Sequence, residues 1–147
     1  MKALDLYNCS FSDFAKPFRD NEVLYKQARD FWSQLDNAAW GVLGITLMAG
    51  IGFAFFYYTV FNNTTGRHYK PKFWWLFMLL TSLTVLVVSL ILELIMASPK
   101  LEGAFAVEMK VAFISALYSL IPFLVVSFSW CNFSLPTNAY RYLKISK

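Results

Sequence analysis

The chain has 147 residues, of which 58% are hydrophobic and only 15% are charged, with 13 Lys or Arg against 9 Asp or Glu and a net charge of +4. A typical soluble domain has about a quarter of its residues charged, so this composition excludes a soluble globular domain. Disorder is excluded as well, because Phe, Trp and Tyr make up 19% of the chain and disordered chains contain few aromatic residues.

Residues 1–37 form a polar N-terminal tail before the first apolar stretch. Within this tail, residues 21–36 are predicted to form an amphipathic helix that is capped by Asp20 or Asn21. We expect this helix to lie along the membrane surface, although its pattern fits docking on the soluble part of a partner equally well. The side chains of its apolar face are Leu24, Ala28, Phe31, Trp32 and Leu35.

Residues 38–133 contain three long apolar stretches, at about 38–61, 73–97 and 107–133. Each is long enough to cross a bilayer, because the hydrocarbon layer is about 30 Å thick and a helix rises about 1.5 Å per residue. Backbone polar groups in hydrocarbon must bond to one another, which favours helices. We therefore predict an all-α integral membrane protein with three transmembrane helices, preceded by the amphipathic interfacial helix.

Turn-forming residues and prolines mark the ends of these spans. The cluster at residues 62–66 stops the first span, and Pro71 stands at the beginning of the second, where its missing N–H costs little. Ser98 and Pro99 close the second span, since proline disfavours helix in the residue before it. Pro122 lies inside the third span and is expected to kink it by removing one backbone hydrogen bond.

Small residues recur at helical spacing in the first and third spans. Such residues let membrane helices approach one another closely, and this packing drives helix association in lipid. The simpler interpretation is that they join the three helices of one chain. Together they exceed what one small bundle buries, so we favour contacts with other subunits. The residues are Thr46, Gly50 and Ala54 in the first span and Ala112, Ser115, Ser119 and Ser129 in the third.

Glu93 is the acidic residue of the second span. A carboxylate at mid-bilayer costs about 3 kcal/mol even on the lenient insertion scale, so such acids are usually functional. The functional interpretation is an ion or proton path, and the interpretation that we favour is an acid at the membrane edge that pairs with Lys100, Lys110 or a neighbouring subunit. The side chains of the candidate path are Ser82, Ser89, Glu93 and Glu108.

An odd number of spans places the two termini on opposite sides of the membrane. The loop before residue 73 and the C-terminal tail, residues 134–147, share a side whose charges are all basic. The positive-inside rule makes this side cytoplasmic and the N-terminus external. We expect a multi-pass protein, of a bacterial inner membrane. The basic residues are Arg67, Lys70, Lys72, Arg141, Lys144 and Lys147.

Catalytic, cofactor and metal motifs are missing from the sequence. Its one histidine, His68, lies in the basic loop, and a zinc site needs about four ligands. We therefore expect no enzymatic role, no cofactor, no nucleic-acid partner and no small-molecule substrate. The expected partners are the lipid bilayer and other membrane subunits.

The function that we favour is a non-enzymatic transmembrane subunit that packs into and scaffolds a larger multi-protein membrane complex, for example a secretion or other envelope machine. The alternative is a homo-oligomeric ion channel or pore-forming membrane effector, in which the polar side chains of the second and third spans line an aqueous path.

Overall fold

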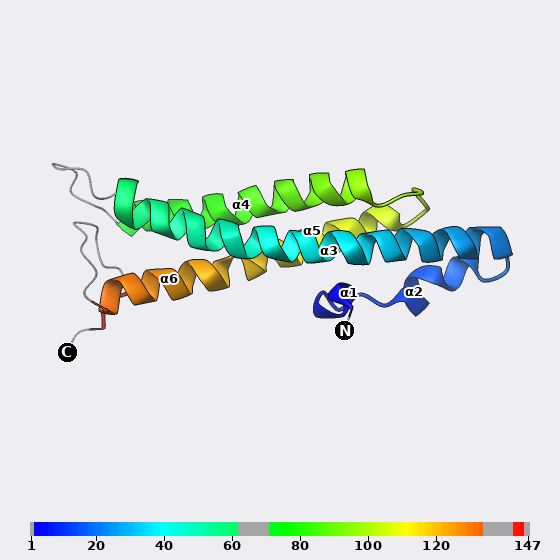
Figure 1. Ribbon diagram of the computed structural model, residues 1–147, viewed down its shortest axis with the longest axis horizontal. Coiled ribbons are helices and arrows are strands. Elements are labelled where there is room, and N and C mark those ends of the chain that lie inside the picture. Colours follow the sequence, from blue (N-terminus) through cyan, green and yellow to red (C-terminus); the bar gives the residue numbers. More distant parts are fainter. Residues whose placement is uncertain (1, 62–70, 134–142, 146–147) are drawn as a thin grey trace. The chain divides into compact units, whose positions relative to one another are not determined.

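The computed structural model describes residues 2–61, 71–133 and 143–145, and these residues form helices and no strand. Figure 1 shows the elements in chain order. They are α1 (Ala3–Leu6), α2 (Phe11–Ala15), a 3₁₀ turn η1 (Lys16–Phe18), α3 (Glu22–Phe56), a π-helical turn η2 (Tyr57–Phe61), α4 (Pro71–Met96), α5 (Ala104–Tyr118) and α6 (Leu120–Asn132).

Three helical stretches are long and apolar enough to cross a membrane, which confirms the prediction of three apolar helices. They are Glu22–Phe61, Pro71–Met96 and Ala104–Asn132. The second begins at Pro71 and ends two residues before Ser98, as the proline positions predicted. These three candidate spans indicate a multi-pass membrane protein.

The chain divides into two compact units, and α3, α4 and α5 each contribute residues to both. Unit 1 consists of Met1–Ile45 and Leu86–Ser115. Unit 2 consists of Thr46–Val85 and Ala116–Lys147. Each unit is described by itself below.

In unit 1, the amphipathic segment at residues 21–36 is not a separate helix. It begins at Glu22 and continues without a break into the first span as α3. Asn21 is the capping residue, because its side-chain oxygen accepts hydrogen bonds from the backbone N–H groups of Val23 at 3.1 Å and Leu24 at 3.2 Å. The predicted boundary at residue 37 is therefore no helix boundary.

The apolar face of this segment is covered by the protein's own N-terminal residues, and Figure 1 shows α1 and α2 alongside the first half of α3. The ring of Phe14 lies 5.2 Å from that of Phe31 and 5.6 Å from that of Trp32, between centroids. The Asp36 carboxylate accepts the Leu4 amide at 3.0 Å. Of the five predicted membrane-surface residues, four are buried and one is exposed; they are Ala28, Phe31, Trp32 and Leu35, and Leu24.

This arrangement differs from the prediction of a helix lying on the membrane surface. An apolar face that is already buried against protein cannot insert into lipid. The aromatic residues of α2 remove this face from water in place of lipid. The periodicity identified the buried face correctly, but it carried no information about what covers that face.

Unit 2 is packed around aromatic side chains. Trp74 is buried, and its indole N–H donates to the hydroxyl of Ser127 at 3.3 Å. The hydroxyl of Tyr58 lies 3.5 Å from the sulfur of Cys131, and its ring stacks on that of Trp130. The other buried members of this core are Ala54, Tyr57, Phe77 and Phe123.

The third span, Ala104–Asn132, is interrupted at one residue, Ser119, between α5 and α6, close to Pro122, where a kink was predicted. Pro122 has no N–H with which to bond the carbonyl of Tyr118, and α5 ends at that residue. The helix resumes as α6, whose first turn is closed by a hydrogen bond from the Phe123 amide to the Ser119 carbonyl. The proline thus breaks the helix one turn before its own position.

Candidate functional site

Two glutamates on successive spans are fully buried in unit 1. Glu93 lies in the last turn of α4, and Glu108 lies in the second turn of α5. The loop at residues 97–103 reverses the chain, so the two carboxyl groups lie within electrostatic range of each other. Gly103 ends this loop with a φ of +80°, a conformation that glycine adopts without strain.

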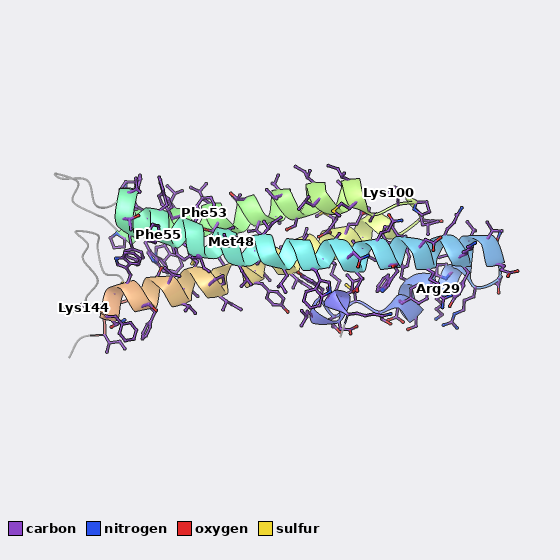
Figure 2. The ribbon with its side chains drawn as sticks, in the orientation of Figure 1. Arg29, Met48, Phe53, Phe55, Lys100 and Lys144 are labelled. Carbon is purple, nitrogen blue, oxygen red and sulfur yellow. The ribbon has the colours of Figure 1, made fainter. Side chains whose placement is uncertain are left out.

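Of these two acids, Glu108 has a charged partner and Glu93 has none. The ammonium of Lys100, on the loop (Figure 2), donates to Oε1 of Glu108. Among the described residues, neither carboxyl oxygen of Glu93 has a hydrogen-bond partner. The ammonium of Lys110 donates to the backbone carbonyl of Asn8 at 2.5 Å.

The predicted ion pair of Glu93 with Lys100 or Lys110 is therefore wrong within the described chain, because both ammonium groups have other acceptors. The side chain of Glu93 is 0% exposed, and its expected position at the membrane edge stays a prediction. Among the described residues, Lys100 forms an ion pair with Glu108 and not with Glu93.

The serines of the candidate path have different environments. Ser89 lies one turn before Glu93 on the same face of α4, and its hydroxyl is fully buried without a hydrogen-bond partner among the described residues. Ser82 belongs to unit 2 and donates to the Ala116 carbonyl at 3.2 Å. We call the unit 1 group, Ser89, Glu93, Lys100 and Glu108, the acid cluster.

The N-terminal segment also reaches α5, which sequence reasoning missed. The hydroxyl of Ser115 donates to the hydroxyl of Tyr7 at 3.3 Å, and both side chains are fully buried. Cys9 borders an open groove of about 370 Å³, which Lys110 also lines. The tail has no periodicity that would indicate such contacts, and the available signal was the presence of apolar and aromatic residues, such as Leu4 and Tyr7, in a polar segment.

Burial raises the pKa of the Cys9 thiol above its ordinary value. The nearby ammonium of Lys110 acts in the opposite direction, and the carboxylate of Glu93, when ionised, adds to the rise in this pKa. Both Cys9 and Cys131 are free thiols, and they belong to different units.

Several small residues that were assigned to contacts with other subunits are used inside the chain. In unit 2, a Cβ atom added to Gly50 would lie 2.4 Å from Cγ of Pro122 and 2.6 Å from the carbonyl oxygen of Ser119. The start of α6 therefore approaches α3 as closely as a glycine permits. Five other predicted small residues of the two spans are buried: Thr46, Ala54, Ala112, Ser115 and Ser119. Ser129 is half-buried and donates to the Val125 carbonyl at 2.8 Å.

The basic side is only partly described. Lys72 and Lys144 are both exposed, and Figure 2 labels Lys144 beyond the end of α6. The ammonium of Lys72 lies 5.3 Å from the centroid of the Phe73 ring. The residues of this side that fall outside the described part of the chain are Arg67, Lys70, Arg141 and Lys147, together with His68 of the same loop.

The acid cluster offers carboxyl, hydroxyl and ammonium groups on two apolar helices, α4 and α5, and on the loop that joins them. Within the described ranges, no group of three His, Cys, Asp or Glu side chains could hold a metal ion. Carboxyl groups in this setting can bind and release protons. The chain matches no protein family, and neither a curated protein nor a solved structure is similar to it.

Proposed function

We propose that the chain is a non-enzymatic transmembrane subunit that packs into and scaffolds a larger multi-protein membrane complex, such as a secretion or other envelope machine. Its three apolar helices cross the bilayer, and its N-terminal segment with the first turns of α3 forms an extramembrane part. The proposal depends on the length of α3 and on what its first turns expose.

The observation that supports this proposal is an exposed apolar surface at the start of a helix that is longer than a bilayer crossing requires. The 35 residues of α3 rise about 52 Å at 1.5 Å per residue, whereas the hydrocarbon layer is about 30 Å thick. With residues 38–61 as the span, residues 22–37 extend outside the hydrocarbon. Val23, Leu24 and Tyr25 are exposed there, and Val23 is 67% exposed. Outside the hydrocarbon, the apolar surface of a partner protein can cover these three side chains.

This proposal is tested by extracting a tagged chain in mild detergent and measuring the mass and composition of the particle. We expect more than one chain per particle. The exposed changes Val23→Glu and Leu24→Glu should release the partners while leaving the chain in the membrane fraction. Lys26→Ala, at an exposed position on the same helix, is the matched control and should retain them. A wild-type particle containing one chain contradicts the proposal.

We also propose that the membrane is a bacterial inner membrane, with the N-terminus outside and the C-terminus in the cytoplasm. The exposed Lys72 and Lys144, on the side that carries basic residues without acidic ones, support this orientation. A cytoplasmic surface that carries anionic lipid attracts such residues by about 1 kcal/mol each.

A second candidate function, a homo-oligomeric ion channel or pore-forming effector, is favoured by one specific observation. Ser89 and Glu93 are fully buried one turn apart on α4, and their oxygens have no hydrogen-bond partner among the described residues. Purified chain in liposomes should then conduct ions, and Glu93→Gln should reduce the flux. Absence of flux from the wild-type chain contradicts this candidate.

A further inference from the structure

We propose that Glu93 is a proton-binding site that holds a proton at neutral pH, beside the ion pair of Lys100 and Glu108. The ligand is a single proton, exchanged with water at the loop formed by residues 97–103. This inference uses the same acid as the channel candidate, but it concerns proton occupancy and does not require conduction.

The first argument is the charge count within the acid cluster. Glu93 and Glu108 carry two negative charges when both are ionised, and the one ammonium that bonds to the cluster is that of Lys100. Glu108 has this ammonium on Oε1, so its carboxylate is the one that the ammonium neutralises. One negative charge remains to be neutralised on Glu93.

The second argument is the burial of Glu93 without any hydrogen-bond donor. Its side chain is 0% exposed, and neither of its oxygens has a partner among the described residues. An isolated carboxylate in apolar surroundings is so unfavourable that the group is neutralised instead. Binding of one proton to either carboxylate oxygen of Glu93 forms an O–H bond and removes the negative charge.

Two further buried oxygens of the acid cluster also have no hydrogen-bond partner among the described residues. The hydroxyl of Ser89 is fully buried without a partner, and Oε2 of Glu108 is also unpartnered. Protonated Glu93 has one O–H to donate, and each of these oxygens is an acceptor of the required kind. Binding of the proton gives Glu93 an O–H donor, which a carboxylate does not have.

The other ionisable groups of unit 1 leave this assignment unchanged. Glu108 of α5, Lys100 of the loop and Cys9 of the N-terminal segment lie within electrostatic range of Glu93. Lys110 of α5 is held by the Asn8 carbonyl, and Asp36 of α3 accepts the Leu4 amide. The side chain of Lys100 is 46% exposed, so it connects the cluster to water, which donates and receives the proton.

The test is infrared spectroscopy of the full chain in lipid vesicles at pH 7, where exposed carboxyl groups are ionised. Protonated carboxyl groups have a C=O stretching band that carboxylates lack. We expect this band in the wild-type chain and its complete loss in Glu93→Gln, which has nearly the shape of the neutral acid. Glu102→Gln, at an exposed position on the same loop, is the control and should keep the full band.

A second variant keeps the test decisive if Glu93→Gln does not fold. Lys100→Met removes the ammonium from Glu108, so a second proton should bind and the band should increase about twofold. No protonated-carboxyl band in the wild-type chain, a band that persists in folded Glu93→Gln, or no increase in Lys100→Met would each overturn the assignment. Liposome flux is measured separately, so failure of the channel candidate is distinguishable from failure of this inference.

Discussion

At Gly50, a single methyl group would meet both the ring of Pro122 and the carbonyl of Ser119. The close approach within unit 2 depends on the missing side chain, and the contact with the Ser119 carbonyl involves backbone that cannot rotate away. Gly52, two residues further along α3, has no atom within 4 Å of the corresponding position. The two glycines therefore form a matched pair in one helix.

We expect Gly50→Ala to destabilise the protein by about 1–3 kcal/mol, as overpacking does in a tightly packed core. Gly52→Ala should be neutral or stabilising by up to about 1 kcal/mol, because alanine favours helix over glycine. Unfolding in detergent micelles, followed by circular dichroism against denaturant, measures both. Equal stability of the two variants would show that α3 and α6 do not approach closely.

Cys9 provides a chemical measurement of its surroundings. Only the thiolate is alkylated, so a raised pKa moves the midpoint of the alkylation rate to a pH above that of an ordinary cysteine. Because the Lys110 ammonium lowers this pKa, Lys110→Gln should move the midpoint higher still. Site-resolved mass spectrometry of iodoacetamide labelling between pH 7 and pH 10 gives the rates. A wild-type midpoint at or below about 8.5 would contradict the burial of this thiol.

At the scale of elements, the N-terminal segment packs against α3 through a hydrogen bond to a carboxylate and a group of aromatic contacts. The bond joins the Leu4 amide to the Asp36 carboxylate. The aromatic contacts place Phe11 and Phe14 of α2 against Trp32. The two kinds of contact position α1 and α2 over the apolar face of α3.

Removal of that carboxylate in Asp36→Ala should cost about 1–3 kcal/mol, the usual range for a hydrogen bond to a charged group. We expect the amide of Leu4 to lose its protection against hydrogen exchange and residues 2–21 to be cleaved faster by protease. Asp30→Ala, at an exposed position on the same helix, is the control and should behave as wild type. Unchanged protection of Leu4 would contradict the docking of α1 on α3.

The elements differ in how far the sequence could predict them. Bilayer thickness fixes the length of an apolar helix, so the three helices, the beginning at Pro71 and the end before Ser98 followed from the residues alone. Periodicity identified Phe31, Trp32 and Leu35 as buried but not the covering helix α2, because burial alone does not name the covering surface.

The acid cluster was likewise predictable from the sequence only in part. The sequence identified Glu93 as unusual because ionisable groups in apolar helices are costly, and it placed Glu108 with Glu93 on the candidate path. It did not identify the partner of Lys100, since the choice between two acids depends on how the loop at residues 97–103 turns. The contacts of Tyr7 and Asn8 with α5 were also beyond reach, because they join residues more than 100 positions apart.

At the scale of the whole molecule, the proposed membrane insertion requires that lipid, and not water, surrounds the three apolar helices. Leu79, Leu83, Val87 and Ile91 are exposed along α4, and only 22% of the most apolar window of this helix is buried inside the chain. Water is a poor solvent for such a surface, whereas hydrocarbon is not. The three candidate spans are the basis of the proposed three crossings, and an odd number of crossings would place the two termini on opposite sides of the membrane.

The most direct measurement of this claim is protease protection of a chain with one tag at each terminus, in right-side-out and inverted membrane vesicles. We expect the N-terminal tag alone to be cleaved in right-side-out vesicles and the C-terminal tag alone in inverted ones. Cleavage of both tags in the same vesicle preparation, with neither cleaved in the other, would contradict three crossings.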